Sequence, residues 1–313
     1  MTALTTPPPT SVTRRGDRAF AGISTGAGIG ILVILAGVAL FLIVQSVPAL
    51  TASASAVPGG RGVVRYIGPL VFGTLVAAVI ALVVAVPLAV GIALFISHYT
   101  PRRLAQGLGY LVDLLAAVPS VVFGLWGVFW LAPRLVPLYA WLSDHLGFIP
   151  LFGQASITAR TILTAGVVLA VMILPIITAI SREIFLQAPR LQEEAALALG
   201  ATRWEMIRLA VLPHGRSGVI SAAMLGLGRA LGETLAVALV LSTSGGLVTA
   251  NLIGNNNPST IAANIANNFP ESTGVATNTL ILSGLVLFAI TFAVNFAARA
   301  VVNRRKDFAG ANA

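Results

Sequence analysis

The sequence predicts an all-α membrane protein with about six transmembrane helices, and both composition and hydropathy indicate this class. Of the 313 residues, 57% are hydrophobic and 9% are charged, far below the roughly 25% charge of soluble domains. Six apolar stretches reach the about 20 residues that a helix needs to cross a hydrocarbon core. Helices are the expected element because an open strand edge in lipid would leave backbone groups unpaired.

The six apolar stretches define the expected organisation of the chain. They lie near residues 24–47, 69–97, 105–131, 159–181, 217–243 and 278–301. Residues 23–303 then form one transmembrane domain, with cytosolic tails at 1–22 and 304–313, and we expect the Pro-rich first tail to be disordered. The segment 182–216 connects the fourth and fifth spans inside the cell, and 244–277 connects the fifth and sixth outside.

The distribution of basic residues predicts the orientation. With the N-terminus inside, the external segments hold only Arg61, Arg65 and Arg134, whereas fourteen basic residues fall on the cytosolic side. These fourteen are Arg14, Arg15, Arg18, Arg102, Arg103, Arg182, Arg190, Arg203, Arg208, Arg216, Arg299, Arg304, Arg305 and Lys306. Such a bias follows the positive-inside rule. We therefore expect a multi-pass protein of the cell membrane with both termini in the cytoplasm. Because the basic residues are spread over separate loops, no nucleic-acid partner is expected.

The connection between the fourth and fifth spans has the pattern of a polar helical hairpin. The sequence "LQEEAALAL" predicts a short helix that stops at Gly200, which can take the left-handed cap position. Thr202 opens a second helix, with Glu205 at the spacing of a capping box, and this helix is expected to end at Leu212, before Pro213. From shape alone, a handle for another protein and an ordinary loop against lipid headgroups are both open.

The hairpin also carries a family resemblance. Glu194-Ala195-Ala196, Gly200 and the pair Leu212-Pro213 resemble the EAA loop of ABC-importer permeases. In that family the loop forms coupling helices that dock into a groove on a separate ATPase subunit. The resemblance implies the type I ABC-importer permease fold and a set of ATPase-coupling residues: Glu193, Glu194, Ala195, Ala196 and Gly200.

A second stretch narrows the resemblance. "GLGRALGETLAV" (226–237) resembles the permeases of phosphate-specific transport (Pst) systems, and its ending is more similar to the PstC type than to the PstA type. The likeness runs from about residue 14 to about residue 308. It implies inorganic phosphate as the transported ion. It also implies three partners: a dimer of ATP-binding subunits, a second, PstA-like permease and an extracytoplasmic phosphate-binding protein. No cofactor is expected on this chain.

The sequence lacks the motifs and clusters of several kinds of catalytic and metal site. The one lysine, Lys306, is followed by Asp307, so the sequence contains no Gly-x-x-x-x-Gly-Lys-Ser/Thr phosphate loop. We therefore expect a non-catalytic subunit, with ATP hydrolysis on a partner chain. The sequence has no cysteine for disulfide or thiolate chemistry. The histidines are scattered at positions 98, 145 and 214, so no metal site is expected.

Ionisable residues within the spans are functional candidates because burying charge in lipid is costly. Arg229 and Glu233 are four residues apart and are expected to share one face of the fifth helix, near its middle. One interpretation is an intrahelical ion pair that helps the helix to insert. The other places Arg229 in the substrate pathway, where its planar donors bind a phosphate oxyanion and Glu233 holds and tunes it. Asp113, in the third span, is expected to form a buried ion pair with a neighbouring helix or a cytosolic arginine, and a place in the pathway is the weaker alternative. Arg160 can snorkel at the external edge of the fourth span, and a role in an anion-attracting vestibule is the weaker alternative.

Small residues mark one stripe of the fifth span. Gly218, Ala222, Gly226 and Ala230 recur every four residues, which predicts close helix packing. The resemblance implies that the contact is with the paired permease around a shared pathway. In the external segment, residues 259–269 predict a short amphipathic helix, either part of a gate or docking surface for the phosphate-binding protein, or an interfacial helix in a solvated loop.

The alternative function is a self-sufficient secondary transporter or channel for an inorganic anion. Such transporters usually have internal repeats with broken helices in both halves, and the sequence contains no convincing repeat. Six spans with one large cytosolic hairpin fit half of a larger assembly better.

Overall fold

The structure is a computed structural model that describes residues 15–243 and 249–310. Within those ranges the regular elements are helices, and the β-pairing is a single isolated bridge between Thr243 and Asn257. The predicted all-α class is therefore confirmed.

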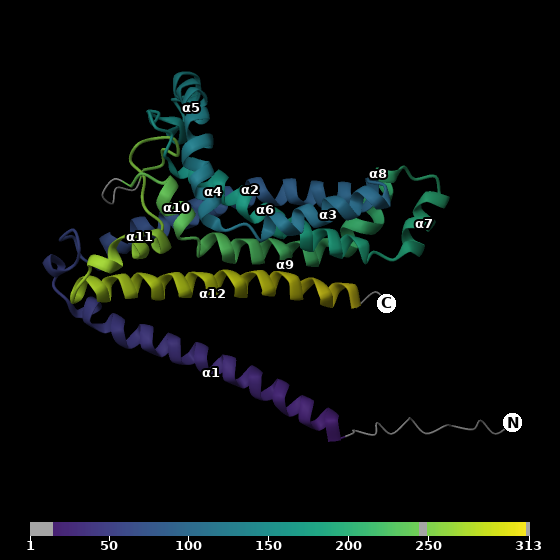
Figure 1. The fold of residues 1–313 in the computed structure, drawn as a ribbon, viewed down its shortest axis with the longest axis horizontal. Coiled ribbons are helices and arrows are strands. Elements are labelled where there is room, and N and C mark those ends of the chain that lie inside the picture. The colour runs from purple at the N-terminus through teal and green to yellow at the C-terminus, as the bar shows by residue number, and fades with distance from the viewer. Residues whose placement is uncertain (1–14, 244–248, 311–313) are drawn as a thin grey trace.

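Long helices run along the longest axis of the molecule (Figure 1). They are α1 (Arg15–Thr51), α2 (Val63–Leu94), α6 (Ile162–Leu186), α9 (Leu212–Leu231) and α12 (Val275–Gly310). Among the described residues, five helical stretches are long and apolar enough to cross a membrane: 16–51, 63–99, 120–146, 162–186 and 275–300. α9 is also 20 residues long, but Arg216 and Arg229 make it less apolar.

Shorter elements connect the long helices. Two α-helices, α3 (Arg102–Ala116) and α4 (Ser120–Trp126), precede α5 (Ala132–Leu146). The hairpin holds α7 (Arg190–Ala198) and α8 (Arg203–Met206), and the segment after α9 holds α10 (Leu235–Val240) and α11 (Ile261–Asn268). Wide π-turns occupy η2 (Phe95–Tyr99), η3 (Gly127–Leu131) and η5 (Ile207–Val211), and 3₁₀ turns occupy η1 (Ala54–Ala56), η4 (Pro150–Phe152) and η6 (Phe269–Glu271).

The prediction of one third span over 105–131 is wrong. α3 ends at Ala116, and a new helix begins at Ser120 and continues through η3 and α5 to Leu146. Pro119 explains the break, because a proline disfavours the helical conformation of the residue before it and lacks the backbone N–H that the ladder needs. The third stretch that is long and apolar enough to cross a membrane, 120–146, therefore begins after this break, and α3 is a separate helix before it.

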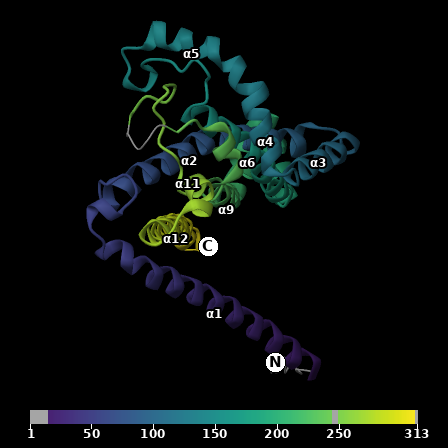
Figure 2. The same ribbon diagram turned by 60° about the vertical axis from the view of Figure 1, so that its left-hand side comes forward.

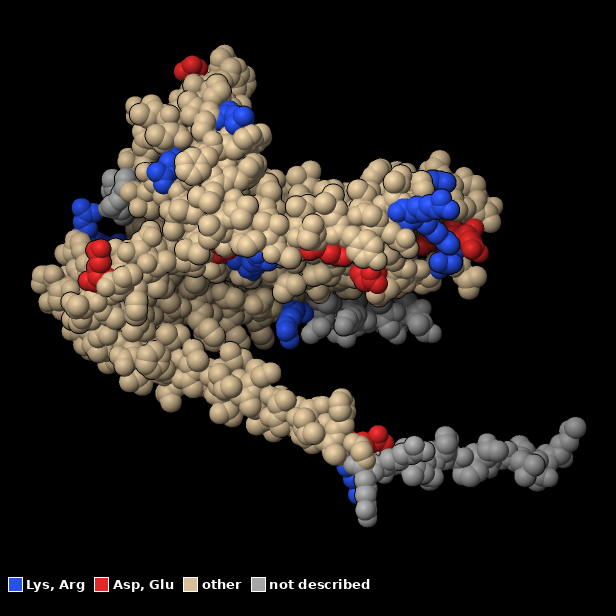
Figure 3. All heavy atoms as spheres, viewed as in Figure 1, with Lys and Arg blue, Asp and Glu red and all other residues tan. Residues whose placement is uncertain are grey.

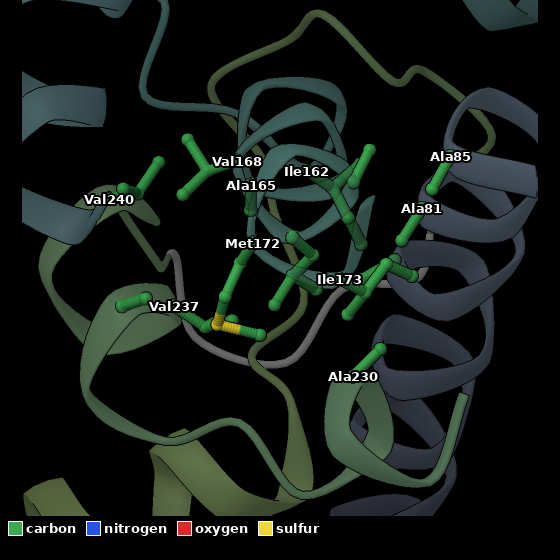
Figure 4. Packing of buried hydrophobic residues seen from close by; sticks show 14 of the residues in the cluster. Ala81, Ala85, Ile162, Ala165, Val168, Met172, Ile173, Ala230, Val237 and Val240 are labelled. Atoms are coloured by element: carbon green, nitrogen blue, oxygen red, sulfur yellow. The ribbon is translucent and has the colours of Figure 1, made fainter. Parts of the chain in front are cut away.

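The core lies between α2 and α6. Ala77, Ala81, Ala85 and Ala89 form a stripe on α2 that is at most 1% exposed, and they belong to one cluster with the large residues of α6 (Figure 4). On α6, a side chain at Gly166 would meet Ile80 of α2. Large side chains of each helix thus pack over small residues of the other, which allows the two helix axes to lie close together.

The small-residue stripe of the fifth span packs within the chain. A Cβ at Gly218 would meet Ile184, and a Cβ at Gly226 would lie 2.8 Å from Ile177, and both of these isoleucines belong to α6. Ala222 on the same stripe is fully buried. The close packing was predicted, but the expected contact with a paired permease is wrong for this stripe, because α6 already occupies it.

The ends of the long helices correct the predicted tails. Residues 15–22 belong to α1 and residues 304–310 to α12, so neither predicted tail is wholly outside a helix. Asp17 in the first turn of α1 suits the positive end of the helix dipole. The rest of the predicted tails, residues 1–14 and 311–313, lies outside the described residues.

The two ends of the molecule differ in what they carry. The first residues of α1 and the last residues of α12 lie at the same end as α7 and α8, whereas α11 lies at the opposite end (Figure 1). Figure 3 shows charged side chains gathered at the end with α7 and α8. α1 diverges from the other helices (Figures 1 and 2), and its most apolar window has none of its residues buried. This chain alone therefore leaves that apolar window of α1 uncovered, whereas Ala49 near the end of α1 is buried against Ile67 and Leu282.

Candidate functional site

The polar hairpin forms with the local signals that its sequence carries. α7 ends before Gly200, whose φ is +87°, in the left-handed region that favours glycine. Thr202 then caps α8: its hydroxyl accepts the backbone N–H of Glu205, and the Glu205 carboxylate accepts the backbone N–H of Thr202 at 2.7 Å. The predicted capping box is confirmed. The Thr202 hydroxyl also donates to the Glu205 carboxylate at 2.8 Å, and the two bonds that this carboxylate accepts from Thr202 lower the pKa of Glu205.

The second helix of the hairpin does not end at Leu212. It continues from α8 through the π-turn η5 directly into α9, where Pro213 stands in the first turn. In the π-turn, the N–H of Leu212 donates to the carbonyl of Ile207, five residues back. This wider turn accommodates the missing N–H of Pro213 and the space that its ring needs. The hairpin and the fifth span are therefore one continuous helical arm.

Apolar packing fixes this arm to the transmembrane helices. Phe185 at the end of α6 is fully buried against Ile207 and Val211 of the arm, in a cluster that also contains Ala93 and Leu94 of α2. Gly215 brings α9 against the Phe185 ring, because a Cβ there would lie 2.6 Å from it. The hairpin, α6 and α9 therefore share one packed core at this end.

The outer side of the hairpin presents apolar side chains to solvent. Leu191 is 80% exposed and Leu199 is 90% exposed. Exposed leucines at the tip of a polar hairpin are typical of a contact surface for another protein. Of the coupling set, Glu193 faces inward, 3.7 Å from the Nε2 of His98, which follows α2. Glu194 and Ala195 lie on the exposed side.

The fifth span is broken where one continuous helix was expected. α9 ends at Leu231 with Gly232 as its cap, and α10 begins at Leu235. Two polar side chains between the helices replace backbone bonds: the Glu233 carboxylate accepts the N–H of Ala236 at 3.1 Å, and the Thr234 hydroxyl donates to the carbonyl of Gly232 at 3.2 Å. Such side-chain bonds compete with the helical ladder.

The break separates Arg229 from Glu233. Arg229 lies in the last turn of α9, whereas Glu233 is 8% exposed and caps the start of α10. The expectation that they share one helix face is wrong, and so is the intrahelical ion pair, because no salt bridge joins these two residues. The guanidinium of Arg229 forms no hydrogen bond or ion pair with any residue that the structure describes.

Arg229 instead lines a cavity of about 620 Å³ between α6, α9 and α12. Arg299 and Asn295 of α12 and Ser221 of α9 line the same cavity. Gly228 borders it too, and the space beside its Cα is open. Two guanidinium groups, an amide and a hydroxyl supply donors suited to an oxyanion. Sequence reasoning assigned Arg299 only to the cytosolic charge count, because nothing local indicates that α12 places it beside α9.

The start of the 120–146 stretch packs against the second half of the broken fifth span. A Cβ at Gly124 of α4 would lie 2.9 Å from the Cα of Ala236 in α10. Arg160 closes the other end of α10: its Nη2 donates to the carbonyl of Leu239 at 2.7 Å and its Nε to that of Val240 at 3.3 Å. Arg160 is thus a helix cap and does not snorkel, which its sequence neighbours could not indicate.

Asn257 connects the external ends of the fourth and fifth spans. Its side chain is 1% exposed; its oxygen accepts the N–H of Ile162 at 3.0 Å, and its amide donates to the carbonyls of Arg160 and Ser242. The predicted short helix follows as α11, capped by Thr260, with Ile261 fully buried. Residues 244–248 of the predicted external segment lie outside the described residues.

Asp113 lies in α3, where its Oδ2 is 3.8 Å from the Nη2 of Arg182 in α6. The carboxylate side chain is 52% exposed and that of Arg182 is 18% exposed. The expectation of a buried pair is therefore wrong as to burial, because α3 lies on the outer side of α6. Gly109 of α3 allows this contact, since a Cβ there would meet the Arg182 guanidinium.

The comparison with protein families matches this architecture. Residues 85–307 match the model of the family "Binding-protein-dependent transport system inner membrane component". The match covers more than half of the chain, so the fold and the hairpin define a class: the membrane component of a binding-protein-dependent transporter.

Curated relatives specify the family further. The chain is 47% identical over 300 residues, 92% of each chain, to the phosphate transport system permease protein PstC 2 of Mycobacterium tuberculosis. It is 45% identical to PstC of Mycobacterium leprae, over 94% of this chain and 95% of that protein. It is also 42% identical to PstC of Xylella fastidiosa, over 75% and 72%. The chain belongs to the PstC family of transport permeases.

Solved structures share the fold. A bacterial ABC transporter involved in the import of the acidic polysaccharide alginate aligns with a TM-score of 0.56 and 15% identity, over 92% of this chain and 99% of that chain. The MetNI methionine ABC transporter in an inward-facing conformation aligns with a TM-score of 0.50 and 17% identity, over 77% and 94%. At these identities the likeness concerns the fold alone.

Proposed function

We propose that this chain is the permease subunit of an ATP-driven importer of inorganic phosphate, in which it forms half of the translocation pathway. The observation that carries the proposal is Arg229, whose guanidinium has no partner among the described residues and lines a cavity at the end of α9, where the fifth span is broken. Placing such a cation in a membrane is costly, and a transported anion would offset that cost. The 47% identity to a PstC protein supports phosphate as the anion.

The partners follow from the surfaces of the chain. A dimer of ATP-binding subunits docks on the hairpin, where Leu191 and Leu199 are exposed. A second, PstA-like permease completes the pathway, and an extracytoplasmic phosphate-binding protein delivers the ion at the end with α11. The hairpin end is the cytoplasmic one, so both termini are cytoplasmic. The chain itself binds no cofactor and catalyses no reaction.

The mechanism assigns separate roles to the two polar residues of the fifth span. Arg229 donates hydrogen bonds to phosphate oxygens, and Arg299 adds a second positive charge on the opposite wall. Glu233 is a positioning residue: by holding the first turn of α10, it fixes the break that exposes Arg229. When ATP binding and hydrolysis move the hairpin, the continuous arm moves α9 and alters the width of this site.

Reconstituted vesicles test the proposal. The complete transporter, with both permeases, the ATPase dimer and the binding protein, should take up radiolabelled phosphate only with ATP. A matched preparation whose ATPase subunit carries a substitution of its phosphate-loop lysine should take up none. Uptake at an equal rate without ATP would identify a channel or secondary transporter instead. Uptake of sulfate in preference to phosphate would show that the assignment of phosphate as the transported ion is wrong.

A further inference from the structure

We propose that the external end of this chain contains a second anion site, which binds a phosphate-sized divalent oxyanion before it enters the pathway. The site lies between the loop that precedes α2 and the helix α11. This inference rests on the proposed function and adds a specific binding position outside the Arg229 cavity.

The site is a cavity of about 410 Å³. Its polar lining includes Arg61, Arg65 and Tyr66 from the start of α2, and Ser259, Asn264 and Asn268 from the region of α11. No acidic residue is among the residues that line it. A volume of a few hundred cubic ångströms is ordinary for small-molecule sites, and guanidinium, amide and hydroxyl groups are the donors that an oxyanion needs.

The charges of this cavity have no partner among the residues that the structure describes. Arg61 stands just before α2 and Arg65 in its first turn, where no acidic residue is present. A helix N-terminus carries a partial positive charge, so cations there are unfavourable and anions are favoured. Neither arginine forms a hydrogen bond or an ion pair with another residue in the described part of the chain. The local positive potential is thus uncompensated until an anion binds.

The opposite wall is already ordered. The side-chain amide of Asn264 donates to the hydroxyl oxygen of Tyr66 at 2.8 Å, which leaves the hydroxyl hydrogen of Tyr66 available to a ligand. The amide of Asn268 donates to the side-chain oxygen of Asn264 at 3.0 Å. This chain of bonds fixes the orientation of Tyr66, and a preorganised donor binds an anion with less loss of entropy.

The position of the cavity connects it to the pathway. Thr243 and Asn257 also line it, and the amide of Asn257 holds the backbone of Ser242 just beyond α10. The cavity therefore adjoins the external end of the broken fifth span. An oxyanion released here by a binding protein would be retained beside that end instead of diffusing away.

An acidic surface of the binding protein is the competing ligand for Arg61 and Arg65. The concave shape and the Tyr66 hydroxyl, which Asn264 orients, favour a small oxyanion, because a docking surface needs no ordered donor in a cavity. The Ser259 hydroxyl already donates to the carbonyl of Thr260 at 3.2 Å. The experiment below therefore measures ion binding and protein docking separately.

The test uses the complete transporter in nanodiscs, without the binding protein, and carries Arg229→Gln so that the pathway site is weakened. Equilibrium dialysis with radiolabelled inorganic phosphate should detect residual binding. The double substitution Arg61→Gln and Arg65→Gln should weaken this binding at least about tenfold. Arg134→Gln is the matched control, because Arg134 is also external but lies over the ring of Trp130, 4.2 Å from its centroid; it should change binding less than about twofold.

Two further measurements keep the result interpretable. Tyr66→Phe removes a single hydroxyl and should weaken phosphate binding about threefold or more, even if the double substitution impairs assembly. Binding of the phosphate-binding protein to the same nanodiscs should be unchanged by either variant. Unchanged phosphate binding in both variants, or a loss confined to docking of the binding protein, would overturn the anion site. Failure of the proposed function has a different signature, since the wild-type transporter would then import no phosphate with ATP.

Discussion

The hairpin end and the pathway region of this chain are built in opposite ways. At the hairpin end, α8, η5 and α9 form one uninterrupted arm, and Phe185 locks it to α6. In the proposed pathway region, the helices are interrupted at residues 117–119 and 232–234, and Arg229 lines a cavity with no partner among the described residues. One region is suited to transmit displacement, and the other is suited to bind an ion and change shape.

The difference shows how one chain can use one region to transmit motion and another to select the ion. An apolar, closely packed lever transmits strain because packed interiors have low compressibility. A broken helix exposes backbone and side-chain groups at the depth where an ion must cross, which is tolerated only where the break lines a cavity or is buried in protein. Changes at the two ends should therefore produce different defects.

The largest effect is expected from Arg229→Gln in the pathway region. Losing charge-assisted hydrogen bonds, each worth about 1.5–3 kcal/mol, should reduce ATP-driven phosphate uptake at least about tenfold while assembly is preserved. Arg229→Lys should be intermediate, because it keeps the charge but not the planar donors. Uptake by proteoliposomes measures this, with Arg134→Gln as the control. Wild-type rates for Arg229→Gln would remove this residue from the pathway.

The next effect is expected at the hairpin, from Leu199→Ser. Burying a leucine side chain stabilises a contact by about 1.5–3 kcal/mol, so the ATPase dimer should bind at least about tenfold more weakly. Phosphate binding to the permeases should not change. Surface plasmon resonance with immobilised ATPase measures the first quantity, and Gln192→Ser, on the same exposed helix, is the control. Equal ATPase affinity for Leu199→Ser and wild type would contradict the proposed docking surface.

A smaller effect is expected where α4 meets α10. Gly124→Ala would place a Cβ 2.9 Å from the Cα of Ala236, and overpacking of this kind costs about 1–3 kcal/mol. Thermal unfolding should therefore occur several degrees lower. Gly228→Ala is the matched control, because nothing lies within 4 Å of its added Cβ. If both variants unfold at the same temperature, α4 and α10 are not in contact.

The smallest effect is expected in the stability of the hairpin at low pH, through the capping box of Thr202 and Glu205. The pKa of Glu205 is lowered from its ordinary value of 4.5 by the bonds from Thr202, so the folded hairpin binds fewer protons than the unfolded one as the pH falls. The stabilisation is complete above 4.5 and disappears as the pH drops through the lowered pKa. Amide exchange in the hairpin should therefore accelerate under acid in wild type and respond less in Glu205→Gln. An identical pH response in both would exclude this role.

The sequence alone predicted the elements that depend on local signals. Gly200 and the Thr202–Glu205 pair specify the turn and the cap without tertiary help, and α11 was expected from helical spacing. The breaks were missed because hydropathy continues across them. Pro119 was a visible signal, and Gly232 with Thr234 a weaker one, but neither ends a span unless its surroundings supply alternative bonds.

The candidate site could be predicted only in part from the sequence, because local patterns do not show where a helix breaks or which distant segments meet. Arg229 stood out because it is a charge in an apolar stretch, which a single sequence reveals. Its relation to Glu233 was misjudged, since periodicity assumes that the helix continues. Arg299, Arg160 and Asn257 obtain their roles from contacts over tens of residues, and such contacts leave no trace in local spacing.

The most direct test uses the absence of cysteine in this chain. Gly228→Cys introduces one thiol into the Arg229 cavity, where a Cβ has open space. In the assembled transporter, a membrane-impermeant maleimide should label it from one side without nucleotide and from the other side with ATP and vanadate. The switch should vanish when the ATPase dimer is omitted. Labelling that changes sides without the ATPase, or never changes sides, would contradict a pathway that is operated through the hairpin.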